Sequence, residues 1–215
     1  MSSKQKDLIS QLSSSLKPVQ PIRLSRTFGL VFSVTLLAPL LFALLLGFRK
    51  DLSWRLGQTG ALLEGIGLLS IFGPLLYSIL KKSIPGRSVS ALWNLVIALG
   101  CGIEIIGLWI GLDGRSLSDH LQAGIERQGL SCSITVLVFA LIPSFLFAGV
   151  LKKLAPERPA LMMGLSFLVA AISGAFAILF HCPANEPIHD LIWHLGPLLP
   201  AFAIGFIAGS RFLKW

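Results

Sequence analysis

The sequence predicts an all-α membrane protein: a bundle of six transmembrane helices with both termini in the cytoplasm. Hydrophobic residues make up 54% of the 215 residues and charged residues only 13%. The apolar residues come in long blocks, and the basic residues are distributed unevenly between the segments that connect them. Few soluble domains have such a composition. Because the blocks are continuous rather than alternating, we expect helices and not a β-barrel.

A bilayer core about 30 Å thick needs about 20 apolar helical residues to cross it. Six blocks meet this length: Phe28–Phe48, Leu56–Leu80, Ala91–Leu112, Cys132–Leu151, Ala160–Phe180 and Leu191–Ser210. The residues before the first block contain no apolar region typical of a signal peptide, so we expect that block to span the membrane. The chain is thus predicted to consist of a cytoplasmic arm, residues 1–27, and a transmembrane domain, residues 28–215.

The net charge of +8 indicates orientation rather than nucleic-acid binding. With the N-terminus inside, thirteen of the 18 Lys and Arg residues fall in cytoplasmic segments. The other five are Arg49, Lys50, Arg55, Arg115 and Arg127. This asymmetry follows the positive-inside rule. The longest outer loop, about residues 113–131, has the pattern of a short interfacial helix through Leu117, Leu121 and Ile125.

The arm has a pattern of its own. Leu8, Ile9, Leu12 and Leu16 recur at helical spacing, and two prolines then favour an extended stretch. One interpretation is a disordered arm or a helix on the lipid surface. The other is a docking segment for a soluble partner, with the apolar stripe entering a groove.

Polar side chains inside a membrane are costly and therefore suggest function. Glu64 and Glu104 are the acids within the predicted spans, each about 12 Å below the outer face at about 1.5 Å per residue. His194 belongs about 5 Å below that face by the same rise. The alternative is that both acids are packing residues, protonated or hydrogen-bonded to a neighbouring helix.

Two of the three cysteines fall at the outer face. Cys132 begins the fourth block and Cys182 follows the fifth, whereas Cys101 lies mid-span and is interpreted as a packing residue. The outer pair could form a disulfide, bind a soft metal as thiolates, or be two unrelated thiols.

The segment from His181 to His194 is the densest polar cluster in the chain, with three imidazoles, one thiol and two carboxylates. Imidazole and thiolate together suit zinc, copper or cadmium as a signal, although no cofactor is required. The spacing matches no standard metal motif. His189 and His194 are five residues apart, which does not place them on one face of an α-helix. The candidate metal ligands are His181, His189, His194, Glu64 and Glu104.

No phosphate loop, zincin motif or nucleophile elbow is present, so the sequence does not indicate an enzyme. A small metal or solute transporter remains an alternative. Transporters commonly place polar groups near the midplane, with repeats and broken helices. Here the polar groups cluster at one face, which favours a sensor.

Several short motifs resemble one known family. The arm, Asp7-Leu8-Ile9 followed by Leu16-Lys17-Pro18-Val19-Gln20-Pro21-Ile22-Arg23, is similar to the N-terminal segment of NrsF-type membrane anti-sigma factors. The turns Gly47-Phe48-Arg49-Lys50-Asp51-Leu52 and Ser83-Ile84-Pro85-Gly86 resemble turns of the same family. The two outer cysteines and Trp193-His194 also fit, so the resemblance covers nearly the whole chain.

The resemblance implies a protein of the bacterial inner membrane that holds an extracytoplasmic-function sigma factor there. A heavy-metal or oxidative signal outside would release it, with Cys132 and Cys182 as the sensing pair. The partners would be the sigma factor and the lipid bilayer, with no direct contact to nucleic acid. The sigma-binding surface would include residues of the arm: Leu8, Ile9, Leu12, Leu16, Pro18, Val19, Ile22 and Arg23.

Overall fold

The computed structural model describes residues 3–14, 23–126 and 129–213, and these residues form helices without any strand. In chain order the elements are α1 (Ser3–Ser14), α2 (Leu24–Leu46), α3 (Leu52–Arg55), α4 (Thr59–Lys82), α5 (Ala91–Gly111), α6 (Leu117–Glu126), α7 (Gly129–Leu154), α8 (Pro159–Ile178), α9 (Pro187–His189), the π-helix η1 (Asp190–Leu195) and α10 (Leu198–Phe212).

Six helical segments in the described part of the chain are long and apolar enough to cross a membrane, as the sequence predicts. The sixth combines α9, η1 and α10. Several boundaries differ from expectation by up to four residues. The first span begins at Leu24 rather than Phe28, and the second begins at Thr59 because α3 is a separate turn of helix before it.

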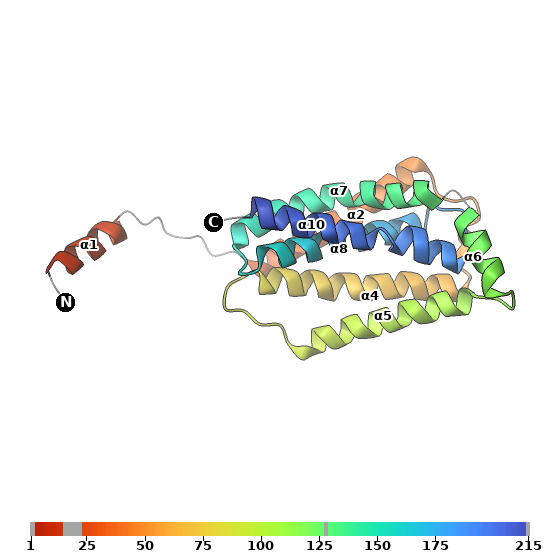
Figure 1. Ribbon diagram of the computed structural model, residues 1–215, viewed down its shortest axis with the longest axis horizontal. Coiled ribbons are helices and arrows are strands. Elements are labelled where there is room, and N and C mark those ends of the chain that lie inside the picture. The colour runs from red at the N-terminus through yellow and green to blue at the C-terminus, as the bar shows by residue number, and fades with distance from the viewer. Residues whose placement is uncertain (1–2, 15–22, 127–128, 214–215) are drawn as a thin grey trace.

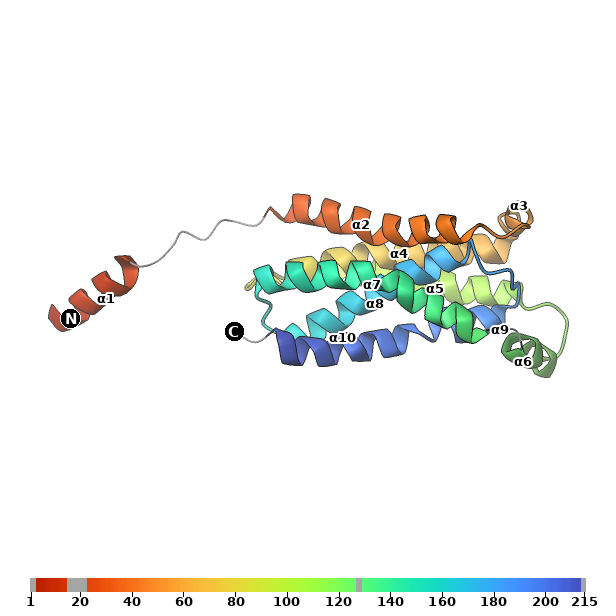
Figure 2. The same cartoon turned by 90° about the horizontal axis from the view of Figure 1, so that it is seen from above.

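Helix α8 is at the centre of the bundle. It packs against α7, α10, α4 and α2, while α5 lies along α4 at one edge (Figures 1 and 2). Small residues allow this close packing, as is common between membrane helices. A Cβ atom added at Gly174 of α8 would lie 2.6 Å from the carbonyl oxygen of Val136 on α7.

The outer surface of the bundle is apolar. Leu45, Trp109, Phe145 and Leu199, from four different helices, are each between 72% and 76% exposed. Apolar side chains so exposed along whole helices match a lipid environment and would be a liability in water. The surface therefore supports the prediction of a membrane protein.

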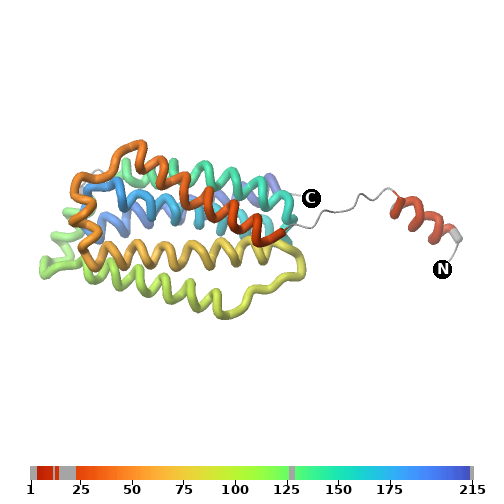
Figure 3. Tube along the Cα trace, turned by 180° about the vertical axis from the view of Figure 1, so that it is seen from behind, coloured from red at the N-terminus to blue at the C-terminus, as the bar shows by residue number. Residues whose placement is uncertain are grey.

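The two ends of the bundle are different. The end where α2 starts and α10 finishes also holds the turns at residues 83–90 and 155–158, and we call it the arm end. The opposite end, which we call the thiol end, holds α3, α6 and residues 179–189 (Figures 1–3). The helix expected in the longest loop is α6, which lies across the thiol end (Figure 2).

The first part of the arm is helical, as its periodicity predicts. In α1 the side chains of Leu8 and Ile9 are 57% and 54% exposed. Arg23 precedes α2 and is exposed. The predicted partner-binding residues Leu16, Pro18, Val19 and Ile22 lie outside the described residues.

Candidate metal centre

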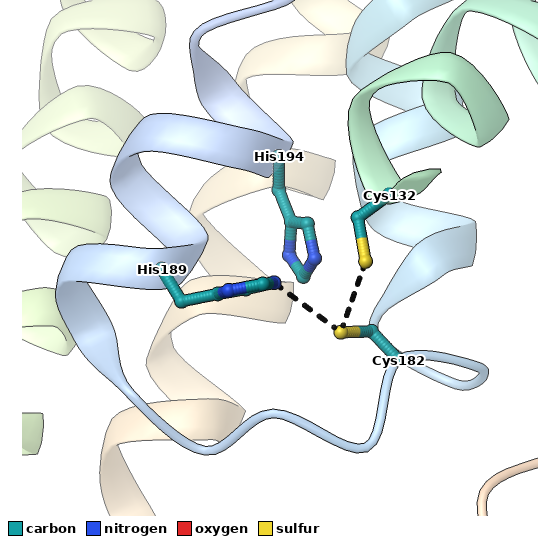
Figure 4. A group of neighbouring side chains, drawn as sticks. All are labelled: Cys132, Cys182, His189 and His194. Carbon is teal, nitrogen blue, oxygen red and sulfur yellow. Dashed lines mark hydrogen bonds between the residues drawn. The ribbon is translucent and has the colours of Figure 1, made fainter. Parts of the chain in front are cut away.

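Four side chains from three segments converge at the thiol end. Cys132 lies in the first turn of α7, Cys182 follows the end of α8, His189 ends α9 and His194 lies in η1. One ligand atom from each lies within 4.8 Å of the other three. The four side chains point toward a common centre (Figure 4).

The sulfur atoms are neighbours although 50 residues separate them in the chain. Cys132 Sγ and Cys182 Sγ are 3.4 Å apart, and Cys182 Sγ is 3.5 Å from His189 Nε2. Cys182 and both histidines are at most 2% exposed, and Cys132 is half-buried. The hydrogen bond with Cys132, together with burial, raises the pKa of the Cys182 thiol above its ordinary value.

The expectation that His189 and His194 cannot share a helical face is wrong, because the chain forms a π-helix at this point. The N–H of Gly196 donates to the carbonyl of Leu191, five residues earlier, at 3.1 Å. This wider turn brings residues i and i+5 onto one face, and π-turns occur often at functional sites. The two imidazole rings lie 5.2 Å apart, edge to face.

A buried ionic chain runs from His194 into the bundle. His194 Nδ1 is 2.9 Å from Asp190 Oδ1, and the other oxygen of Asp190 accepts a hydrogen bond from Arg55 Nη2 at 2.9 Å. The same nitrogen donates to Glu64 at 2.8 Å. Arg55, Glu64 and Asp190 are each at most 9% exposed. These ion pairs join η1 to α3 and α4.

The remaining candidate metal ligands lie outside the group of four. Glu64 pairs with Arg55, and Glu104 of α5 faces Gly67 of α4, where an added Cβ would lie 2.7 Å from Glu104 Oε2. His181 turns away: its Nδ1–H donates to the carbonyl of Gly47 at 2.7 Å. We therefore assign His181 to loop anchoring.

Arg49 fixes the loop that carries Cys182. Its backbone N–H donates to the carbonyl of Phe180 at 2.9 Å, and its guanidinium donates to the carbonyls of Pro183 and Ala184. Asp51 accepts two hydrogen bonds from the same guanidinium, at 2.8 and 2.9 Å. These bonds hold the pKa of Asp51 well below its usual range. The Gly-x-Arg-x-Asp turn thus has a structural role in holding the Cys182 loop.

Helix α6 is bound to the same region through a second polar network. The buried His120 lies 3.2 Å from Glu186 and 3.3 Å from Asp113, and Arg115 donates to Glu186 at 3.0 Å. Arg115 also keeps the pKa of Asp113 below its ordinary value. Trp193 Nε1 donates to the carbonyl of Gly124 in α6 at 3.0 Å. Helix α6 therefore covers α9 and η1.

Sequence reasoning identified the thiols and both histidines but missed Asp190, Arg55 and Arg49. Asp190 and His194 are spaced i, i+4, a signal that could have paired them. No sequence signal places Arg55 in a buried position, because it belongs to a loop in the predicted topology. Arg49 was seen only as a basic residue of an outer segment and as part of a family turn.

Two thiols and two imidazoles form the Cys2His2 donor set of structural zinc sites. The thiolates would also accept softer ions such as cadmium or copper(I). The two sulfurs could alternatively be oxidised to a disulfide, which requires them to approach from 3.4 Å to about 2.05 Å. Both reactions would join α7 to the segment after α8.

Comparisons with known proteins agree with the resemblance in the motifs. The family model described as NrsF, negative regulator of sigma F, matches residues 12–215. The chain is 27% identical to the "Probable anti-sigma-F factor NrsF" of Azospira oryzae over 221 residues, which cover 99% of this chain and 100% of that protein. No solved structure matches. The chain therefore belongs to the NrsF family of negative regulators of sigma F.

Proposed function

We propose that this chain is a membrane-bound anti-sigma factor. It binds an extracytoplasmic-function sigma factor at its arm end and releases it when a heavy metal or an oxidant reaches the thiol end. One observation carries the proposal: two thiols 50 residues apart meet at 3.4 Å at the end of the bundle opposite to its termini. In this proposal, signal reception and partner binding take place on opposite sides of a membrane.

The charge distribution supports the orientation that this function needs. Lys81 and Lys82 fall in the last turn of α4, and Lys152 and Lys153 fall in the last turn of α7, all toward the arm end. Under the positive-inside rule this end faces the cytoplasm. The protein would then lie in the inner membrane of a bacterium, with both termini and the sigma factor on the same side.

The arm offers the docking surface. In α1 the side chains of Leu8 and Ile9 are exposed, and the sequence places further leucines at positions 12 and 16, at helical spacing. Pro18, Val19, Ile22 and Arg23 follow in the sequence, and we propose that they also contact the sigma factor. An amphipathic helix followed by the extended segment that the sequence predicts would suit a groove on a folded partner. The sigma factor rather than this chain would contact DNA.

The transporter alternative has less support. In the described part of the chain, the buried charged side chains gather toward the thiol end: Arg49, Arg55, Glu64, Glu104 and Asp190. A conduit would place its polar groups near the midplane. A polar site at one end suits reception of a signal.

The test is capture and release of the sigma factor. The full chain, purified in detergent, should retain an extracytoplasmic-function sigma factor of the same genome, and cadmium or a thiol oxidant should release it. Cys132→Ser, Cys182→Ser and the double variant should all retain the sigma factor and fail to release it. Cys101→Ser is the matched control, because this thiol is exposed on α5 and does not belong to the group that contains the pair. Failure of the wild-type chain to retain any such sigma factor would refute the function, and normal release from the double variant would refute the sensor.

A further inference from the structure

The four converging side chains include two histidines that a simple thiol switch does not require. We propose that Cys132, Cys182, His189 and His194 form a four-coordinate site for one divalent ion of the zinc and cadmium class, with Asp190 as its outer-sphere carboxylate. The signal would then be metal coordination rather than disulfide formation. This inference rests on the proposed function for its biological meaning, but the site itself can be tested independently.

The distances fit one tetrahedral ion. With Zn–S bonds of about 2.3 Å and Zn–N bonds of about 2.0–2.1 Å, two sulfurs are about 3.8 Å apart and a sulfur and a nitrogen about 3.6 Å apart. The distances between Cys132 and Cys182 sulfurs and between Cys182 Sγ and His189 Nε2 are 3.4 and 3.5 Å. With all four ligand atoms within 4.8 Å of one another, shifts of a fraction of an ångström to about an ångström complete the shell.

The position of His194 beside a carboxylate is that of a supported metal ligand. Metal-binding imidazoles usually donate their second ring N–H to a carboxylate or a carbonyl, which fixes the tautomer and the ring orientation. Asp190 lies 2.9 Å from His194 Nδ1, so Nε2 of His194 is left for the ion. Asp190 is held in turn by Arg55 at 2.9 Å. A disulfide would need none of these groups.

Charge balance also favours an ion. A divalent cation with two thiolates and two neutral imidazoles has no net charge, so its burial carries a smaller desolvation penalty than burial of a charged group. On binding, the two thiols lose their protons to water and no electron is transferred. The donor set contains no oxygen atom, which disfavours magnesium and calcium.

The surrounding structure holds the ligands in place before any ion arrives. Arg49 fixes the loop of Cys182, and Ser133 Oγ, next to Cys132, donates to the carbonyl of Trp193, next to His194, at 2.9 Å. Helix α6 covers the site through the bond of Trp193 to Gly124. The entropy lost by ordering the ligands on metal binding is therefore small.

Metal binding to the full chain in detergent tests the site. The reduced wild-type protein should bind one Cd²⁺ or Co²⁺ per chain, and bound Co²⁺ should show the visible spectrum of a tetrahedral thiolate site. X-ray absorption of the Cd²⁺ or Zn²⁺ form should count two sulfur and two nitrogen neighbours, which requires no variant. Cys132→Ser and Cys182→Ser should abolish this spectrum. His189→Ala and His194→Ala should weaken binding at least 100-fold, and Asp190→Asn about 10- to 100-fold.

Cys101→Ser is the matched control, because this thiol is exposed on α5 and is not one of the four ligands, so its loss should leave metal affinity unchanged. Three outcomes would overturn the site: no stoichiometric binding by the wild type, a shell without nitrogen, or full affinity in both histidine variants. Capture of the sigma factor by the same metal-free preparations separates the two proposals. A normal metal site without capture would refute the anti-sigma function alone, whereas capture and oxidant-driven release without metal binding would refute the site alone.

Discussion

Arg55 is the residue whose loss should cost the most stability at the thiol end. Its guanidinium lies between Glu64 at 2.8 Å and Asp190 at 2.9 Å, and the side chains are 10%, 3% and 5% exposed, respectively. Arg55→Met keeps the length and removes the charge, which leaves two buried carboxylates without their cation. Removing one partner of a buried ion pair typically costs about 3–5 kcal/mol. We expect the lower end, about 3 kcal/mol, because Arg55 lies at the edge of the spans and retains some contact with solvent.

Thermal unfolding of the purified chain in detergent, with a chelator present, measures this loss. At about 2–4 °C per kcal/mol for a protein of this size, the midpoint should fall by about 6–12 °C. Lys50→Met is the matched control: this cation is exposed in the same segment, and its loss should stay within about 0.5 kcal/mol. Adding Glu64→Gln and Asp190→Asn to Arg55→Met removes the uncompensated charges and should recover at least half of the loss. A midpoint within 2 °C of wild type for Arg55→Met, or no recovery in the triple variant, would show that the chain of charges does not stabilise the fold.

Two further predictions concern topology and docking. The topology is tested in a chain whose three cysteines are replaced by serine. Ser118→Cys on α6 should react with a membrane-impermeant thiol reagent in intact cells with a permeabilised outer membrane, whereas Ser88→Cys at the arm end should react only after lysis. The reverse labelling pattern would invert the proposed orientation. The double variant Leu8→Asp with Leu12→Asp should weaken sigma-factor capture at least 100-fold, because each buried leucine contributes about 1.5–3 kcal/mol. The control variant, Ser10→Asp with Ser14→Asp, adds the same charges to the opposite face of α1 and should leave capture unchanged. Equal capture by both variants would exclude the apolar stripe as a docking surface.

The six spans, and the placement of both thiols at one end of the bundle, could be predicted because they depend on block lengths and on the short turn between two blocks, which can be read from the sequence. Apolar block length gave six spans, and a short turn between the fourth and fifth blocks made α7 and α8 neighbours with Cys132 and Cys182 at the same end. The histidine pairing could not be predicted in this way. The pairing depends on a π-turn. Residues five apart lie on different faces of an α-helix but on the same face of a π-helix.

The buried charges show a second limit of sequence reasoning. Glu64 was expected within the second span, but its partner Arg55 was placed in an outer loop, because charged residues are rarely buried. The exception arises from tertiary structure: α3 folds Arg55 back over the end of α4, where Glu64 and Asp190 both reach it. A pair of this kind follows from the approach of three elements and not from the spacing within any one of them.

The arrangement of helices explains how an event at the thiol end can reach the arm end. Cys132 and Cys182 lie at the thiol-end termini of α7 and α8, and the 155–158 turn joins the other ends of the same two helices. At that turn Glu157 accepts a hydrogen bond from the N–H of Gly86, in the turn between α4 and α5. Helix α4 is thus connected to the α7–α8 pair at the arm end and, through Arg55 and Asp190, to η1 at the thiol end.

An ion at the proposed site would fix the thiol ends of α7, α8 and η1 relative to one another. Because α8 is packed on four sides, a change in its tilt is shared with α4 and α7 rather than absorbed locally. We expect the turns at residues 83–90 and 155–158 to shift together in that case, beside the start of α2. Such a shift releases a sigma factor only if the metal-bound arrangement has the lower affinity for it, since a ligand with equal affinity for both states changes nothing. If the proposed switch operates, the Ser-Ile-Pro-Gly turn that carries Gly86 would be a structural part of it at the arm end, as the Gly-x-Arg-x-Asp turn would be at the thiol end.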